Sequence, residues 1–239
     1  MKAKPVGGTL AALCAATGLA VTTASPAAAE VRTGWIGATP PIGGIVYLHT
    51  STIDNGGVPK ASSRIYTSFG QTVPQGTIGA KARLFREGAL CGATDYQFNL
   101  FISNQQNAAV TKDCGPGFYN SHGFVAVYPA GGTMSEYVTF PSDPLQYPAT
   151  GVAAAAAVDT TPGVNGSGQR YGSAADITDD ANLPDLVLAI GRNGETGYIA
   201  ATDLRTPQPD PNAAVVAREV ELLDREGKPT GATFQFQSP

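Results

Sequence analysis

The sequence predicts a mainly β fold, with a disulfide-bearing β-sandwich or barrel followed by a small hairpin-based β (α+β) domain. Three observations lead to this prediction. Short runs rich in β-branched and aromatic residues recur at near-regular intervals and are broken by Gly, Pro and Asn. The first half holds no useful stretch with the 3.6-residue period of a helix. Gly 29 and Pro 18 together make up about a fifth of the chain, a composition rich in turns.

Residues 1–29 have the three parts of a signal peptide. Lys2 and Lys4 form a positive n-region, an apolar stretch of small residues follows from Leu10, and the alanines at 27–29 suit a signal peptidase. The apolar stretch is too short and too weakly hydrophobic to span the ~30 Å of hydrocarbon in a bilayer. We therefore expect a secreted, extracellular protein that has no membrane partner once the signal is cleaved.

Charge excludes one class of partner. Without Lys2 and Lys4, the exported chain carries 13 basic and 19 acidic side chains, a net charge of −6. Non-specific nucleic-acid binding needs a basic surface, so we expect no nucleic-acid partner. The 14% charged and 42% hydrophobic content also exclude wholesale disorder.

Two cysteines remain after export, Cys91 and Cys114. An even number of cysteines in an exported chain predicts one structural disulfide. This bond closes a loop of about 24 residues and is worth on the order of 3 kcal/mol in the chain-entropy model. The alternatives are a metal site or a reactive thiol pair, but the two cysteines lack the close spacing of zinc ligands.

Charge also divides the exported chain. Residues 30–158 carry seven acids and seven bases, whereas residues 159–239 carry twelve acids and six bases. Between the halves lies an alanine run followed by a Gly-, Ser- and Pro-rich stretch, which is typical of a linker or long loop. The domains we expect are a β domain with the disulfide at 30–149, a linker at 150–169 and a small acidic hairpin domain at 170–239.

The strands expected in the first half are β-branched or aromatic segments that end at turn signals. The segment 78–85 alternates in part between a small, apolar face and a face with two basic residues. Its Ala80, Ala82 and Leu84 share one face, and Lys81, Arg83 and Phe85 share the other. The expected strands are 45–50, 64–69, 78–85, 96–101, 123–128 and 137–140.

The second half predicts two hairpins. Asn193-Gly194 is a strong turn signal between the apolar segments 186–190 and 197–201. A second turn at 225–228 separates the segments 219–224 and 230–237. The spacing of Ala213, Val216 and Val220 also fits a helix, so we expect a short helix from 212 to about Arg218 before the strand begins.

The tail resembles a group of secreted actinobacterial proteins to which no activity is assigned. The motifs that carry the resemblance lie within residues 183–236. They are Pro184-Asp185-Leu186-Val187, Gly194-Glu195-Thr196-Gly197-Tyr198-Ile199, Asp203-Leu204, the Pro-rich residues 207–211 and Asp224-Arg225-Glu226-Gly227. The resemblance implies an origin and an exported location, and it brings no catalytic residue.

Catalytic signatures are sparse. A Ser-His-Asp hydrolase needs one of the two histidines, and His122, in a loop-like context, is the candidate. The chain lacks the Gly-x-Ser-x-Gly nucleophile elbow. Paired carboxylates, as in glycoside hydrolysis, are a second route, and Asp95 and Asp113 are the acids that the disulfide would bring together.

The acidic segment 176–185 is the densest group of oxygen ligands. Calcium takes six to eight oxygens, but the spacing is not that of an EF-hand, and helix capping and solubility explain the acids equally well. Calcium is therefore the one cofactor that the sequence suggests, and we otherwise expect none. The candidate ligands are Asp176, Asp179, Asp180 and Asp185.

The function that we expect is non-catalytic binding of a cell-wall or environmental polymer. Export, many tyrosines on β segments and the lack of a catalytic signature favour it, although tyrosine is also simply a good strand former. The alternatives are a secreted hydrolase, or a proteinaceous inhibitor or toxin that presents the Cys91–Cys114 loop. The candidate binding residues are Tyr47, Tyr66, Tyr96 and Tyr119.

Overall fold

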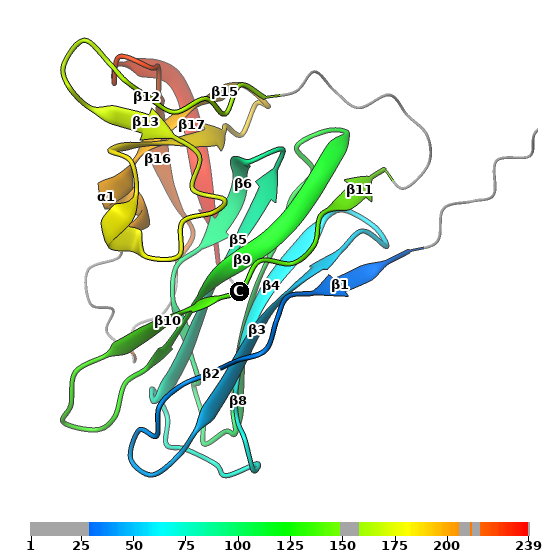
Figure 1. The fold of residues 1–239 in the computed structure, drawn as a ribbon, viewed down its shortest axis with the longest axis vertical. Helices are drawn as coiled ribbons and strands as arrows, with labels where there is room; N and C mark the ends of the chain where they lie inside the picture. Colours follow the sequence, from blue (N-terminus) through cyan, green and yellow to red (C-terminus); the bar gives the residue numbers. More distant parts are fainter. Residues whose placement is uncertain (1–28, 149–157, 206–210, 212–215, 239) are drawn as a thin grey trace, which may run out of the picture.

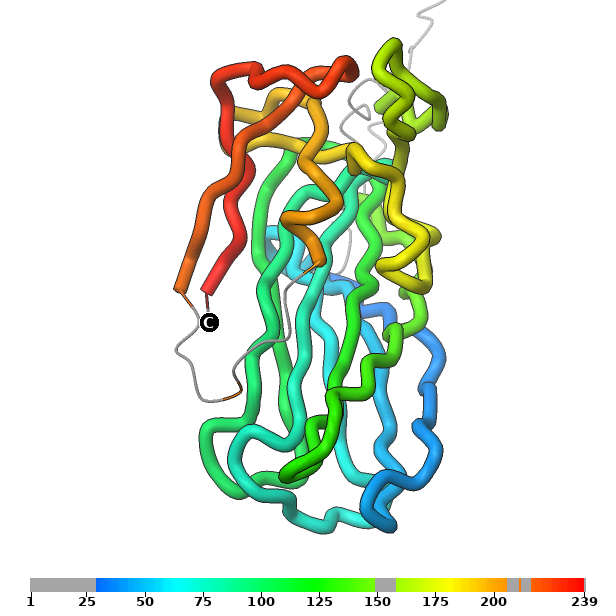
Figure 2. Tube along the Cα trace, turned by 90° about the vertical axis from the view of Figure 1, so that its left-hand side faces the viewer, coloured from blue at the N-terminus to red at the C-terminus, as the bar shows by residue number. Residues whose placement is uncertain are grey.

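The computed structural model describes residues 29–148, 158–205, 211 and 216–238. These residues form a two-layer β-sandwich with a group of shorter strands at one end (Figures 1 and 2). The first sheet is antiparallel and has the strand order β1-β3-β4-β8, with β2 beside β3. Its strands are β1 (Val31–Thr33), β2 (Gly37–Ala38), β3 (Tyr47–Asp54), β4 (Lys60–Thr67) and β8 (Gln105–Thr111).

The second sheet has the order β10-β9-β5-β6-β17-β16-β15-β14-β13-β12, with β11 beside β9 and β7 beside β5. Its first strands are β5 (Ile78–Arg86), β6 (Ala89–Thr94), β7 (Gln97–Phe98), β9 (Gly117–Val127), β10 (Ser135–Thr139) and β11 (Leu145–Tyr147). The remaining strands are β12 (Gly163–Val164), β13 (Arg170–Gly172), β14 (Leu186–Ile190), β15 (Thr196–Ala200), β16 (Arg218–Leu223) and β17 (Pro229–Gln237). The described helices are the 3₁₀ turn η1 (Asp180–Asn182) and α1 (Ala201–Leu204).

The mainly β prediction is confirmed. The main core lies between the sheets and takes the inward residues of β3, β4 and β8 and of β5 and β9, as the period of two requires. All nine residues of β5 are buried, because a second layer covers its other face. Among the fully buried side chains of the main core are Ile53, Ile65, Val110, Ile78, Leu84 and Val125.

Strand β6 belongs to two structures at once. It pairs with β5 along one edge, and its other edge pairs with β14 at Leu90 and with β17 at Ala93. These pairings close a ring, β6-β17-β16-β15-β14, around a second core that includes Phe234 and Phe236. The two sequence halves therefore share one strand. In Figure 1, β16 and β17 of the ring are orange and red, and β6 is blue-green.

Both expected hairpins are present. β14 pairs with β15 around Asn193-Gly194, and β16 pairs with β17 around residues 225–228. Strand β16 begins at Arg218, as expected. Of the helix expected from residue 212 to about Arg218, residues 212–215 lie outside the described residues, and residues 216 and 217 are not helical. Within the expected linker 150–169, residues 150–157 also lie outside the described residues, and β12 occupies 163–164.

The expected strand 96–101 is wrong in its second half. Only Gln97–Phe98 pairs, because the side chain of Asn99 bonds instead to the backbone at Ile78, Pro74 and Phe101 and turns the chain. Leu100 consequently points outward and is 59% exposed, rather than sharing the buried face of Tyr96 and Phe98.

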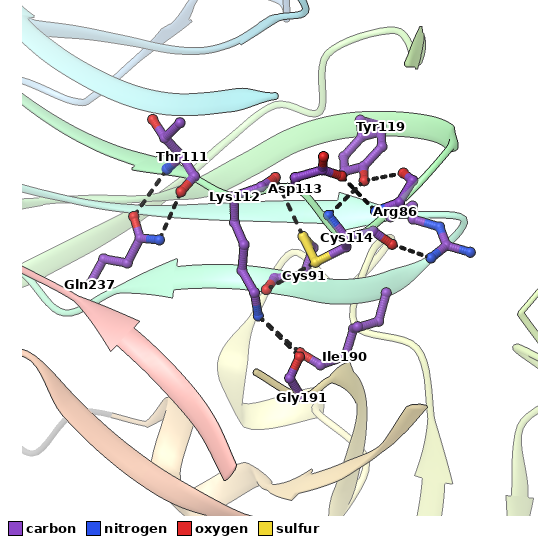
Figure 3. The surroundings of a disulfide bond; sticks show 11 residues. Arg86, Cys91, Thr111, Lys112, Asp113, Cys114, Tyr119, Ile190, Gly191 and Gln237 are labelled. Carbon is purple, nitrogen blue, oxygen red and sulfur yellow. Dashed lines mark hydrogen bonds between the residues drawn. A yellow bond between two sulfur atoms is a disulfide. The ribbon is translucent and has the colours of Figure 1, made fainter. Parts of the chain in front are cut away.

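The predicted disulfide between Cys91 and Cys114 is present and joins β6 to the β8–β9 connection (Figure 3). Beside it, Lys112 Nζ donates to the carbonyl oxygens of Ile190 (3.1 Å) and Gly191 (3.5 Å) in the ring. Burial lowers the pKa of Lys112 to about 8. The side chain of Gln237 bonds to both the N–H and the C=O of Thr111, so that β17 covers the end of the open edge of β8. This corner fixes the sandwich to the ring.

Candidate functional site

Two cations lie on the face of β5 that points away from the main core. Lys81 and Arg83 are 3% and 1% exposed, and the register places them opposite Phe124 and His122 of β9. An unpaired ion at such a position costs several kcal/mol, so the fold must supply counter-charges.

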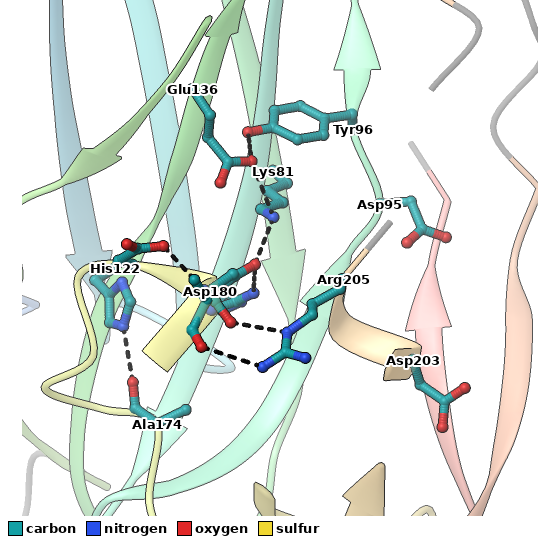
Figure 4. Close-up of polar contacts among 12 residues, drawn as sticks. Lys81, Asp95, Tyr96, His122, Glu136, Ala174, Asp180, Asp203 and Arg205 are labelled. Atoms are coloured by element: carbon teal, nitrogen blue, oxygen red, sulfur yellow. Dashed lines mark hydrogen bonds and ion pairs between the residues drawn. The ribbon is translucent and has the colours of Figure 1, made fainter. Parts of the chain in front are cut away.

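The counter-charges come from two other elements (Figure 4). Asp180 Oδ2, in η1, accepts from Lys81 Nζ at 2.9 Å and from Arg83 Nη2 at 2.8 Å. Glu136 Oε2, on β10, lies 3.3 Å from Lys81 Nζ and accepts from the Tyr96 hydroxyl at 2.5 Å. We call Lys81, Arg83, Glu136 and Asp180 the buried charge cluster. Its two cations and two carboxylates balance.

The cluster holds the segment around η1 against the sheet. Burial works to raise the pKa of Asp180, but Arg83 and Lys81 outweigh it and leave that pKa below its ordinary value. Arg205 Nε also donates to the backbone carbonyl of Asp180 at 2.9 Å. Burial, and then Glu136, raise the pKa of Tyr96 well above its usual range. These contacts pair each charge with an opposite one, although Arg83 Nη1 and Asp180 Oδ1 are buried without a hydrogen-bond partner among the described residues.

His122, the candidate hydrolase residue, lies beside this cluster and is 1% exposed. Its ring stacks on Phe85 at 5.0 Å, and its Nε2 lies 3.1 Å from the carbonyl oxygen of Ala174. Burial, followed by the nearby Arg83, lowers the pKa of His122 to about 4. The imidazole is thus neutral near pH 7 and packed out of reach of a substrate, and the loop context expected for it is in fact strand β9.

The candidate carboxylate pair does not form either. Asp95 makes a two-pronged ion pair with Arg218, at 2.7 and 2.9 Å. Asp113 accepts instead from the backbone N–H of Gly115 and from the Tyr147 hydroxyl. Each acid thus has a structural partner of its own.

The four candidate calcium ligands do not converge on one position. Asp180 joins the buried charge cluster, Asp179 caps η1 by accepting from the Ala181 N–H, and Asp185 accepts from the Arg170 N–H. Asp176 is exposed. Within the described ranges, no group of three or more His, Cys, Asp or Glu side chains is placed to share a metal ion.

Three of the four candidate binding tyrosines are buried. Tyr47, Tyr96 and Tyr119 are at most 4% exposed, so their rings present no binding surface and the expectation for them is not supported. Their burial has a simple cause, since each fills a core as a large apolar body whose polar tip is hydrogen-bonded or at the edge. Tyr66 alone is partly exposed.

Tyr66 lies on the outer face of the first sheet, which no described layer covers. The guanidinium of Arg64 sits 4.8 Å from the centre of its ring and donates to Gln105 Oε1. The register places Gln105 opposite Tyr66 and Asn107 opposite Arg64, so these four side chains form a square on the sheet. Next to them is an open hollow of about 560 Å³, which we call the amide hollow. Its lining is Arg64, Ser103, Gln105, Gln106 and Asn107.

Exposed apolar side chains gather at the adjoining end of the sandwich. Phe69 in the β4–β5 loop is 85% exposed, and Leu100, Phe101 and Ile102 in the β7–β8 loop are 59, 80 and 74% exposed. The two loops are joined by the bridge between Val73 and Ser103. The same end, lowest in Figure 1, also carries the β2–β3 and β9–β10 loops.

This end of the sandwich carries no charge in those four loops. They lie within the sequence stretches 33–53, 65–80, 96–111 and 114–135, which hold no Asp, Glu, Lys or Arg. We call these four loops the uncharged end. Exposed apolar groups at such density mark a contact surface more often than a solvent-facing one.

The sequence analysis did not predict this surface, because it searched for catalytic and ligand-binding residues and not for stretches without charged residues. The run Leu100-Phe101-Ile102, bounded by Asn99 and Ser103, resembles part of a strand until Asn99 is known to turn the chain. The four charge-free stretches of the sequence were the available signal. Trp35, at 83% exposed, stands apart beside Pro141 and Asp143.

Comparisons with known proteins add no assignment. No protein-family model matches the chain, nor does any curated protein or solved structure. The resemblance of the tail to secreted actinobacterial proteins therefore stays a prediction. Within the described part of the chain, no helix is long and apolar enough to cross a membrane, and α1 has only four residues.

Proposed function

We propose that this chain is a secreted, non-catalytic protein that binds a cell-wall or environmental polymer through the uncharged end. The supporting observation is the exposure of Phe69, Leu100, Phe101 and Ile102 on two joined loops that hold no charge. Within the described part of the chain these side chains lie largely outside the core, and leaving them in water forgoes about 1.5–3 kcal/mol each. A contact surface is the explanation that remains.

The catalytic alternatives have no comparable support. His122 and the acids of the buried charge cluster are engaged in packing and ion pairs, and Asp95 and Asp113 have separate partners. The inhibitor or toxin alternative relied on the loop closed by Cys91 and Cys114. Both cysteines are buried where the sandwich meets the ring, and β8 fills part of that loop.

The test is co-sedimentation of residues 30–239 with peptidoglycan and a panel of insoluble polysaccharides, with and without calcium. We expect binding to at least one polymer and a loss of about tenfold or more in the Phe69→Ser/Phe101→Ser double variant. Phe118→Ser is the matched control, because Phe118 is also exposed, at 47%, but lies toward the opposite end of β9.

Three outcomes would contradict the proposal. One is failure to bind any polymer in the panel. Another is equal loss of binding in the Phe118→Ser control. The third is binding to zwitterionic lipid vesicles and to no polymer, which would make the uncharged end a lipid-inserting surface instead.

A further inference from the structure

We infer that the amide hollow is the subsite that recognises the polymer, and that the polymer is an uncharged polysaccharide. The inference rests on the proposed function, because it names the ligand class of a surface that adjoins the uncharged end. Chain connectivity makes the two surfaces continuous. Phe69 follows β4 directly, and Phe101 precedes Ser103, which lines the hollow.

The first argument is the chemistry of the lining. Gln105 and Asn107 place two carboxamides on the outer face of β8, and Ser103 adds a hydroxyl. A carboxamide offers two donors and an acceptor, so it complements a sugar hydroxyl, which also donates and accepts. The volume of about 560 Å³ lies within the range of ligand sites in proteins, and the open shape suits a chain that runs through rather than a molecule enclosed on all sides.

The second argument is the rigid platform beneath the hollow. The Arg64 guanidinium lies 4.8 Å from the centre of the Tyr66 ring and is hydrogen-bonded to Gln105, and these residues occupy neighbouring strands of one sheet. A group built on strands, with its rotamers fixed by stacking and hydrogen bonds, pays little ordering entropy when it binds. The exposed Phe69 and Phe101 rings at the end of the platform supply apolar faces for the C–H faces of sugar rings.

The third argument is charge. The hollow holds one cation, Arg64, which is already bonded to an amide oxygen, and it holds no carboxylate. Residues 30–158, which form the sandwich, carry seven acids and seven bases, so they set up no net attraction for an anionic polymer, and the adjoining uncharged end offers nothing to attract one. A neutral partner satisfies the lining and meets no repulsion.

The test measures binding of soluble neutral and acidic polysaccharides by the exported chain, using affinity electrophoresis at low and high salt. We expect binding to a neutral polysaccharide that is insensitive to salt, since no ion pair contributes. Gln105→Ala/Asn107→Ala should weaken it by about tenfold, the worth of two lost hydrogen bonds of about 1 kcal/mol each with some compensation by water. Gln146→Ala, an exposed amide on β11, is the control and should leave binding unchanged.

Two results would overturn the inference and leave the proposed function standing. Neutral binding that is lost in Phe69→Ser/Phe101→Ser but unchanged in Gln105→Ala/Asn107→Ala would move the subsite out of the hollow. Binding only to an acidic polysaccharide, weakened by salt and by Arg64→Gln, would reverse the ligand class. If the unaltered chain bound no polymer at all, that result would instead refute the proposed function itself.

Discussion

The buried charge cluster and the uncharged end invert the usual distribution of residues. In the first region Lys81 and Arg83 are almost fully buried, and in the second Phe69 and Phe101 are almost fully exposed. The first inversion is compensated within the fold, since Asp180 and Glu136 neutralise both cations. The second has no compensation within the described residues. The buried charges are therefore explained by the stability of the fold, whereas the exposed apolar side chains are better explained by contact with a partner.

The largest effect that separates the two regions is expected for Asp180→Ala. This change leaves Lys81 and Arg83 buried with only the more distant Glu136, and breaking a buried pair in this way costs about 3–5 kcal/mol. The free energy of unfolding in urea measures it. Asp176→Ala, at an exposed acid of the same segment, should stay within about 0.5 kcal/mol. Equal effects of the two changes would show that the cluster does not hold this segment.

A smaller effect is expected from acid. The pKa of His122 is about 4 in the folded chain and ~6.5 when unfolded, because burial and Arg83 disfavour the imidazolium. Above pH 6.5 both states are neutral and pH has no effect through this residue. As the pH falls toward 4, the unfolded chain takes up a proton that the folded chain does not, so stability is lost.

The measurement compares the unaltered chain with His122→Gln. Between pH 7.5 and 4.5 the unaltered chain should lose about 2–3 kcal/mol more than the variant, from a difference of about two pKa units at 1.36 kcal/mol each. Burial also lowers the pKa of His49, but both proteins retain that residue, so its contribution cancels. Identical pH profiles would show that His122 is accessible to protons in the folded state.

The smallest effect on stability is expected at the uncharged end. Phe69→Ser and Phe101→Ser remove side chains that are 85% and 80% exposed, so each should change the free energy of unfolding by less than about 0.5 kcal/mol. The urea experiment that serves Asp180→Ala measures it. A loss above 1 kcal/mol in either variant would mean that the phenylalanine side chain packs within the molecule, and the contrast between the two regions would disappear.

Much of the fold follows from local signals. Strands β3 and β17 are rich in β-branched or aromatic residues, β14 is an apolar run, and the Asn193-Gly194 hairpin forms where it is predicted. Strand β6 escaped because Ala-Leu-Cys-Gly-Ala-Thr has little β preference of its own and is a strand through its neighbours. The turn before it is equally inconspicuous. Glu87 and Gly88 both have positive φ there, where Asn-Gly is usual.

The candidate sites were harder to predict, since each depends on contacts between distant segments. The sequence places Asp180 in an acidic group that favours calcium, whereas its true partners, Lys81 and Arg83, lie in another part of the chain. The tyrosines are similar, because strand preference says nothing about which face a second layer covers. Only the cysteine pair could be assigned, since residues 30–239 hold just two cysteines and so offer a single pairing.

The shared strand β6 has a consequence for how the molecule divides. A ring that closes on β6 is incomplete in any fragment that begins after it, so the second half has no independent template for β14 and β17. Two pieces of this chain, separated between residues 148 and 158, are therefore expected to behave as halves of a split protein. Neither piece would fold on its own, and both would fold when the two were mixed. The two halves are therefore expected to fold only as one unit.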